Sequence, residues 1–106
     1  MSVIDRFETL LAQGQDNALL RFGLGNAYLQ AGQPDRAIAH LQATLGHDPG
    51  YSAAYKALGK AFAESGDTDQ ATETYRKGIE VAEQKGDKQA AKEMTVFLKR
   101  LNRDKP

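Results

Sequence analysis

The sequence contains no cysteine, which excludes disulfide bonds, thiolate catalysis and metal sites built on cysteine ligands. It also lacks any apolar run near the roughly 20 residues that a bilayer-spanning helix needs. Neither sign of charge is in excess, because 14 Lys and Arg residues balance 14 Asp and Glu residues. The chain as a whole therefore produces no long-range field that would recruit nucleic acid or an anionic membrane, and we expect neither as a partner.

The N-terminal segment MSVIDRFETLLAQG has no signal-peptide pattern, because it is amphipathic and acidic where a signal peptide is basic and then apolar. We expect a complete, cytoplasmic protein, since the chain starts at Met1 and ends in the polar segment NRDKP. Its 106 residues suit one domain with a single modest core. Basic residues gather between Lys85 and Lys105. A tail of this kind can contact RNA or lipid, but acids and apolar residues interrupt it, so a solvated helix face is the favoured interpretation.

One stretch of the sequence returns 34 residues later: LGNAYLQAG, at 24–32, comes back as LGKAFAESG, at 58–66. Laying residues 18–51 over 52–85 keeps small residues on small ones and bulky residues on bulky ones. The matched pairs are Leu24/Leu58, Gly25/Gly59, Ala27/Ala61, Tyr28/Phe62, Gly32/Gly66, Asp35/Asp69, Ala37/Ala71, Leu41/Tyr75 and Leu45/Ile79. The chain therefore contains two copies of one unit, which we call the first copy (18–51) and the second copy (52–85).

Each copy is predicted to form two helices, because its apolar residues recur at helical spacing. Gly32 and Gly66 are suited to end the first helix of each copy, and Pro34 is suited to open the next. The first copy stops at Asp48-Pro49-Gly50, whereas the second copy has no such stop. Its last helix is therefore expected to run on to about Lys85.

Two further helices are expected at the ends. Residues 1–14 match the second helix of a copy, since Val3, Phe7 and Leu11 fall on the positions of Ala37, Leu41 and Leu45. Residues 87–103 carry an apolar stripe behind the capping residue Asp87. Six helices follow, with no convincing strand. One helical hairpin cannot bury both of its faces, so the copies must stack and the end helices must seal the stack.

A 34-residue helix–turn–helix unit with Leu-Gly-x-x-Tyr, then Ala-x-x-x-Phe, then Pro resembles the tetratricopeptide repeat. The first copy has Leu24-Gly25-x-x-Tyr28, Ala37-x-x-x-Leu41 and Pro49, and the second has Leu58-Gly59-x-x-Phe62 and Ala71-x-x-x-Tyr75. The whole chain is similar to the short stand-alone bacterial members of this family. The resemblance implies an all-α fold, a right-handed α–α superhelix of about six helices, whose concave groove holds a peptide or partner segment.

Several positions depart from the usual pattern or carry a local cost. Arg21 stands where the family prefers a large apolar residue, and its aliphatic stem is expected to cover the packing there. Gly25 and Gly59 lie inside helices, where glycine costs about 1 kcal/mol relative to alanine. A cost repeated at one register indicates a neighbouring helix too close for a side chain. Ala37 and Ala71 are predicted to be the small residues facing these glycines.

No enzyme, cofactor or metal site is predicted. The histidines, His40 and His47, are seven residues apart, and two ligands without a carboxylate make a poor metal site. No serine, threonine or lysine near them is placed as a nucleophile. The Gly-x-Gly of residues 23–25 lies inside a helix with no strand before it, so it is not a phosphate-binding loop. Both histidines are interpreted as structural or surface residues.

Binding is better supported, and the residues expected to line the groove come from the first helix of each copy. They are Leu19, Phe22, Asn26 and Leu29 from the first copy, and Ala53, Lys56, Lys60 and Ala63 from the second. The two lysines are one helical turn apart and repel each other, which a nearby acid or an acidic ligand would relieve. Two alternative interpretations stay open: that both lysines merely solvate an exposed face, and that Phe22 belongs to the core.

The prediction is thus a non-enzymatic protein–protein interaction module that binds a protein or peptide with some acidic character. The chaperone-binding members of the family use a set of lysines and asparagines of which only Asn26 matches here, so that activity is not carried over. The alternative is a self-assembling, homodimeric scaffold that uses its end helices, a class to which the off-stripe Val96 lends weak support.

Overall fold

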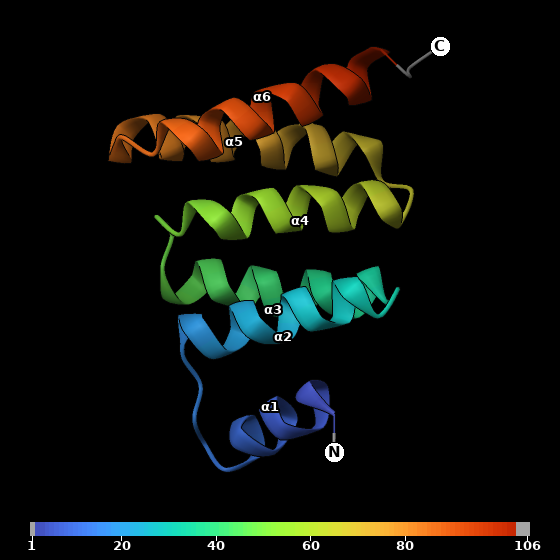
Figure 1. Cartoon of the computed structure of the whole chain (residues 1–106), viewed down its shortest axis with the longest axis vertical. Helices are drawn as coiled ribbons and strands as arrows, with labels where there is room; N and C mark the ends of the chain where they lie inside the picture. The colour runs from blue at the N-terminus through green and yellow to red at the C-terminus, as the bar shows by residue number, and fades with distance from the viewer. Residues whose placement is uncertain (1, 104–106) are drawn as a thin grey trace.

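A computed structural model describes residues 2–103 of the chain. Six α-helices make up this part, and it contains no strand, which confirms the all-α prediction (Figure 1). The helices are α1 (Val3–Ala12), α2 (Ala18–Gln30), α3 (Pro34–His47), α4 (Ser52–Glu64), α5 (Thr68–Lys85) and α6 (Lys88–Arg103). None of them, over residues 2–103, is long and apolar enough to cross a membrane.

The helix boundaries follow from capping residues in the sequence. The side chain of Asn17 accepts a hydrogen bond from the backbone N–H of Leu20 at 2.9 Å, which satisfies one free donor at the start of α2. Pro34 is the first residue of α3, where a missing N–H costs nothing. Gly32 and Gly66 have φ angles of +75° and +89°. These left-handed conformations end α2 and α4 without the steric cost that a side chain would bring.

The helices form a stack of hairpins. α2 pairs with α3 and α4 pairs with α5, while α1 contacts α2, and α6 contacts both α4 and α5. In Figure 1, α2 lies in front of α3 and α6 lies in front of α5. α4 contacts both α2 and α6, so these three helices share one side of the stack. This arrangement brings side chains from α2, α4 and α6 to a common surface.

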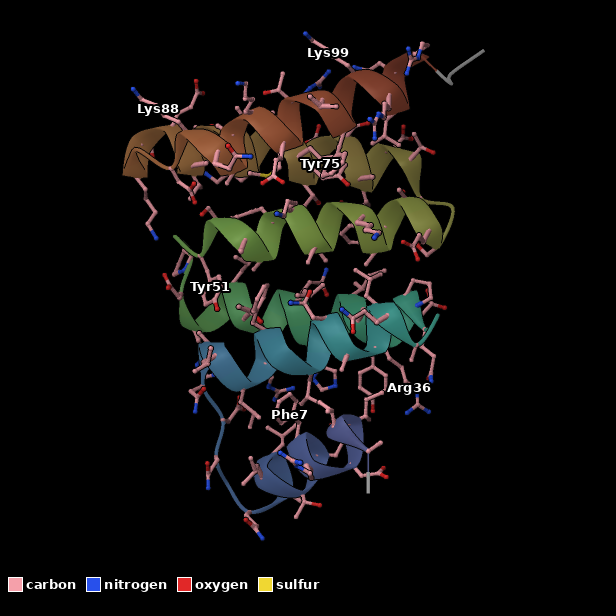
Figure 2. The ribbon with its side chains drawn as sticks, in the orientation of Figure 1. Phe7, Arg36, Tyr51, Tyr75, Lys88 and Lys99 are labelled. Carbon is pink, nitrogen blue, oxygen red and sulfur yellow. The ribbon has the colours of Figure 1, made fainter. Side chains whose placement is uncertain are left out.

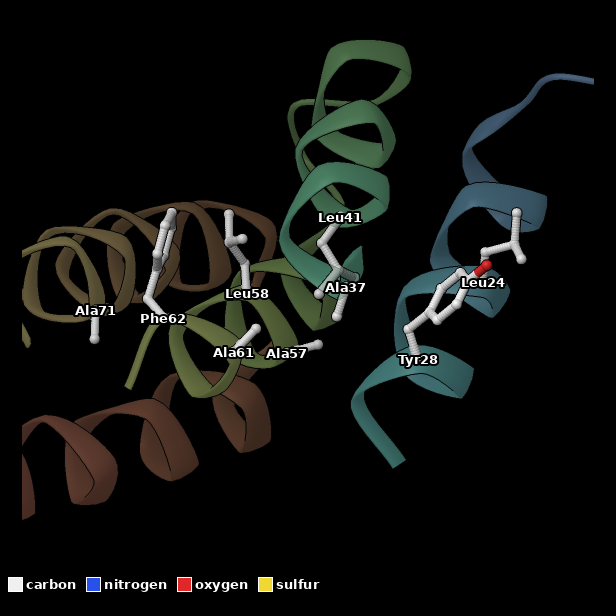
Figure 3. Packing of buried hydrophobic residues seen from close by; sticks show 9 residues of the cluster. All are labelled: Leu24, Tyr28, Ala37, Leu41, Ala57, Leu58, Ala61, Phe62 and Ala71. Carbon is white, nitrogen blue, oxygen red and sulfur yellow. The ribbon is translucent and has the colours of Figure 1, made fainter. Parts of the chain in front are cut away.

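Two apolar clusters hold the stack together. The larger one joins the two copies and contains Leu24, Tyr28, Ala37, Leu41, Ala57, Leu58, Ala61, Phe62 and Ala71 (Figure 3). The second joins the second copy to α6 and contains Tyr55, Tyr75, Val81, Ala82, Ala90 and Met94. Each copy therefore buries its apolar face only against a neighbour, as expected for stacked repeats.

The mid-helix glycines mark the closest approach within each hairpin. A Cβ atom added to Gly25 would lie 2.5 Å from the Cγ of Leu41, and one added to Gly59 would lie 2.4 Å from the Cε1 of Tyr75. The prediction of crowding at these glycines is thus confirmed, but the identity of the facing residue was wrong. Leu41 and Tyr75 have large side chains that lie directly against the backbone of these glycines, so no side chain fits there. The buried Ala37 and Ala71 lie one helical turn earlier.

Candidate functional site

The surface shared by α2, α4 and α6 contains a groove with a cavity volume of about 350 Å³. Its lining residues are Phe22, Asn26, Leu29 and Gln30 from α2, Ala53, Lys56, Ala57 and Lys60 from α4, and Phe97 from α6. We call this surface the groove. Its floor is apolar, and its polar groups are two amides and two ammonium groups. Such a mixture suits a segment that offers apolar contacts together with hydrogen-bond acceptors.

Six of the eight residues predicted to line the groove lie together in it: Phe22, Asn26, Leu29, Ala53, Lys56 and Lys60. The other two lie elsewhere. Leu19 is 73% exposed and does not line the groove. Ala63 is half-buried and packs against the larger apolar cluster. The helical periodicity identified the correct face of α2 and α4 but not how far along each helix the hollow extends.

Phe22 packs against the core and also lines the groove. Its ring lies 4.8 Å from the ring of Tyr51, centroid to centroid, with the planes tilted by 37°. The side chain is half-buried against the larger apolar cluster. Tyr51 comes from the loop between α3 and α4 (Figure 2). Phe22 therefore presents one anchored aromatic surface to the groove, which a ligand can contact without first ordering the ring.

The two lysines of the groove are in different states. The ammonium group of Lys56 lies 3.2 Å from a carboxylate oxygen of Glu93 on α6, and both side chains are 37% exposed. Lys60 is exposed, and within residues 2–103 it has no carboxylate at ion-pair distance. Within residues 2–103, one lysine is thus already paired, and the other offers a positive charge without an ion-pair partner at the edge of an apolar hollow.

The contribution of α6 to the groove was not expected from the sequence. Phe97 lines the hollow, and Glu93 neutralises Lys56. The sequence did contain a pattern that predicts this contribution. α6 starts 36 residues after α4, whereas the two copies are offset by 34 residues. α6 therefore takes the place of the first helix of a third copy, shifted by two residues. The strict 34-residue comparison could not show this.

A polar cluster lies away from the groove, where the loop before α2 meets α3. Arg21 donates two hydrogen bonds to the carboxylate of Asp16, from Nε to Oδ1 at 2.8 Å and from Nη2 to Oδ2 at 2.9 Å. The Nε2 atom of His47 lies 2.9 Å from the same Oδ1, and the Nη1 atom of Arg21 lies 3.2 Å from the Nδ1 atom of His40. The expectation that the stem of Arg21 covers an apolar contact misses this role: its head group joins three elements.

The electrostatics of this cluster follow from its hydrogen bonds and burial. The bond from Arg21, followed by that from His47, holds the pKa of Asp16 well below its usual range. Burial lowers the pKa of His40, against the opposing effect of the nearby Glu8 carboxylate. Within residues 2–103 there is no group of three or more His, Cys, Asp or Glu side chains that could hold a metal ion. The cluster has the geometry of a structural clamp.

Comparison with known proteins agrees with this geometry. The family model of the tetratricopeptide repeat matches residues 4–51 and 22–88, which together cover most of the chain. The chain belongs to the tetratricopeptide repeat family. A tetratricopeptide repeat-containing protein of Pseudomonas aeruginosa is 52% identical over 101 residues, which cover 95% of this chain and 96% of that one.

Solved tetratricopeptide structures have the same arrangement of helices. The solution structure of a Bordetella parapertussis protein is 45% identical, with a TM-score of 0.88, and the match covers 98% of this chain and 90% of that one. The Sgt2 tetratricopeptide domain of Aspergillus fumigatus is 27% identical, with a TM-score of 0.72, over 97% of this chain and 71% of that one. Members of the family are generally non-enzymatic interaction modules, and the fold suggests that role here.

Proposed function

We propose that the groove binds an extended or helical segment of a partner protein that carries acidic residues. The observation that supports this most directly is Lys60, which has no ion-pair partner among residues 2–103. It lies beside the Lys56–Glu93 ion pair, at the edge of a hollow lined by Phe22 and Phe97. Asn26 and Gln30 add amides that pair with an extended backbone. We expect a cytoplasmic protein as the partner rather than nucleic acid or lipid, because the chain has no net charge that would recruit either of them.

Recognition combines apolar burial with charge. The rings of Phe22 and Phe97 supply contact area that is already ordered by the core, and Lys60 selects a carboxylate next to it. A carboxylate of the partner that displaced Glu93 would engage both lysines. Standard interfaces bury about 800 Å² per partner, and the parts of three helices that line the groove offer less, so we expect modest affinity.

The test is a pull-down from native cell lysate, read by mass spectrometry, with three baits. Wild type is compared with the double variant Lys56→Glu/Lys60→Glu and with the matched control Arg76→Glu/Lys77→Glu, which reverses two exposed charges on α5. We expect a partner that wild type and the control both capture and that the groove variant loses. Equal capture by all three baits would place binding outside the groove and contradict the proposal.

A purified complex then tests the mode of binding. The backbone amides of Phe22, Asn26 and Lys60 should shift in nuclear magnetic resonance spectra when the captured partner is added. Affinity should also fall as salt rises, because the proposed contact includes exposed charges. Shifts confined to α1 or α5, or affinity that is independent of salt, would contradict an acidic ligand in the groove.

A further inference from the structure

The N-terminal end of the stack exposes a face that the first copy buries. α1 has the register of a second helix, so Val3 corresponds to Ala37 and Leu10 to Thr44. Ala37 and Thr44 are both 0% exposed, because the first helix of their own copy covers them. Val3, by contrast, is 52% exposed, and Leu10 is only half-buried. Within residues 2–103, α1 is a second helix without its first helix.

The C-terminal end presents the opposite half. With the 36-residue offset between the starts of α4 and α6, Ala90 and Met94 take the places of Ala54 and Leu58. All four are buried, with exposed fractions of 7%, 0%, 0% and 5% respectively. α6 therefore packs on the second copy in the same way as α4 packs on the first. Within residues 2–103, α6 is a first helix without its second helix.

The face of α6 that has no partner helix carries small residues, and basic residues line the hollow beside it. In the second copy, Gly59 of α4 lies against Tyr75 of α5. With the same 36-residue offset, Ala91 and Thr95 lie on the corresponding face of α6. Both are half-buried. They border an open hollow of about 420 Å³, whose lining residues are Glu83, Gly86, Lys88, Ala91, Lys92 and Thr95. Small residues at this register leave room for a second helix to approach closely.

We propose that the open face of α6 binds the open face of α1 from a second copy of this chain. The pairing is head to tail, and it completes a third hairpin whose two helices come from different molecules. Each face offers what the other lacks: Val3 and Leu10 are bulky, whereas Ala91 and Thr95 are small. The occupant is a second copy because the two exposed halves belong to one repeat unit.

Charge favours this pairing over one in which two α6 helices meet. α6 exposes a run of basic residues, and Lys88 and Lys99 point away from the stack (Figure 2). Two such helices would bring like charges together, which is unfavourable. On α1, by contrast, Asp5 and Glu8 outnumber Arg6. The symmetric dimer considered from the sequence is therefore disfavoured relative to a heterologous contact.

A heterologous contact extends rather than closes unless its rotation happens to form a ring. Each added copy would continue the row of α2, α4 and α6 and lengthen the groove. One helix on each side buries less area than the roughly 800 Å² per partner of a standard interface, so we expect weak association. Short chains of copies should form at high local concentration and dissociate on dilution.

Two variants, each blocked at one end, test the proposal. Ala91→Arg/Thr95→Arg fills the hollow of α6. Val3→Lys/Gln13→Lys adds positive charge to the exposed Val3 of α1 and to Gln13, the exposed residue that caps its C-terminal end. By sedimentation equilibrium up to roughly 1 mM, the range of weak complexes, wild type should gain mass with concentration and each variant should remain monomeric. An equimolar mixture of the two should form a dimer that grows no further, since this pairing uses the one unblocked face of each variant and leaves only blocked faces.

The control is Glu73→Arg/Glu80→Arg, which adds the same number of arginines to exposed positions of α5 and should associate like wild type. Because the mixture must regain association, it also shows that both blocked variants are folded. A wild type that stays monomeric over the whole range overturns the proposal. So does self-association of the Val3→Lys/Gln13→Lys variant alone, which would indicate contact between two α6 helices.

A spin label distinguishes the two geometries independently. The chain has no cysteine, so Gln89→Cys on α6 gives a single attachment site. Labelled protein is mixed with unlabelled, isotopically enriched protein, and the broadened amides of the enriched copy are mapped. Broadening on α1 supports the head-to-tail contact. Broadening on α6, or none at all, contradicts it.

Discussion

Arg21 and Tyr55 occupy the same position in the two copies, 34 residues apart, yet opposite kinds of interaction hold them. Arg21 is bound through its charged head to Asp16 and contacts His40. Tyr55 is 7% exposed within an apolar cluster, and its hydroxyl donates a hydrogen bond to the carbonyl oxygen of Pro49 at 2.8 Å. The two copies share the same backbone arrangement, but different side-chain interactions stabilise this position in each.

The contrast extends along the same edge of both copies. His47 of the polar cluster corresponds to Val81, which is 8% exposed among apolar residues, and Asp16 corresponds to Gly50. The neighbours explain the difference. α6 buries Met94 completely against the second copy, whereas α1 contributes no fully buried residue to the first. The short helix α1 covers the first copy, whose edge is held by hydrogen-bonded charges. The longer helix α6 covers the second copy, whose edge is held by apolar packing.

Exchanging the two residues should have very unequal effects, and this is the largest change that we expect. Tyr55→Arg places a charge in an apolar site whose register lacks the carboxylate of Asp16, so it should lower the free energy of unfolding by about 3 kcal/mol or more. Arg21→Tyr breaks a partly exposed ion pair and should cost about 1 kcal/mol or less. Urea unfolding of both variants measures the difference.

The control for this exchange is Tyr55→Phe, which keeps the ring and removes only the hydrogen bond to Pro49. It should cost about 1 kcal/mol. If Arg21→Tyr destabilised the protein as much as Tyr55→Arg, the polar cluster would be as essential as the apolar one, and the proposed division of the two copies would be wrong.

Substitutions at the mid-helix glycines should destabilise the two copies to a similar extent, and by less than Tyr55→Arg does. Gly25→Leu and Gly59→Leu each force a side chain against a residue that would lie within 2.6 Å of the new Cβ atom. Overpacking of this kind typically costs 1–3 kcal/mol. Thermal or urea unfolding should therefore show similar losses in the first and the second copy, because backbone approach decides this position in both.

Gly46→Leu is the matched control, since no atom lies within 4 Å of its added Cβ and the position is exposed near the end of α3. It should leave stability unchanged or raise it by up to about 1 kcal/mol, through higher helix propensity. A loss at Gly46 equal to that at Gly59 would mean that helix geometry, and not the crowding by Tyr75, makes glycine necessary.

Much of the fold follows from local signals in the sequence. Capping residues such as Asn17 and the glycines at 32 and 66 mark helix ends, and the missing stop after the second copy correctly predicted that α5 reaches Lys85. These signals act within a few residues of where they stand. The two copies also supplied each other's register, so the packing stripes could be compared position by position.

The parts that could not be predicted depend on distant segments. Phe97 lines the groove and Glu93 pairs with Lys56, and both positions depend on a shift of α6 by two residues from the 34-residue period. The bonds of Arg21 depend on where the loop before α2 places Asp16, and no periodicity constrains that loop. Leu19 shows the same limit, because helical spacing gives the direction of a side chain but not whether another element lies opposite it.

The smallest effect that we expect is a pH dependence of stability to which only the first copy contributes. Burial lowers the pKa of His40, whose neighbours in the cluster are Arg21, at 3.2 Å, and Glu8, at 3.8 Å. The unfolded chain therefore binds a proton near the ordinary histidine pKa of about 6.5, while the native protein resists protonation to lower pH. Stability should be fully present above that value and should fall as the pH drops from 7.5 to 5.5. The second copy carries Thr74 at this register and cannot contribute. His40→Gln should therefore flatten the change in urea midpoint over this interval, and an undiminished change in that variant would show that His40 is not its source.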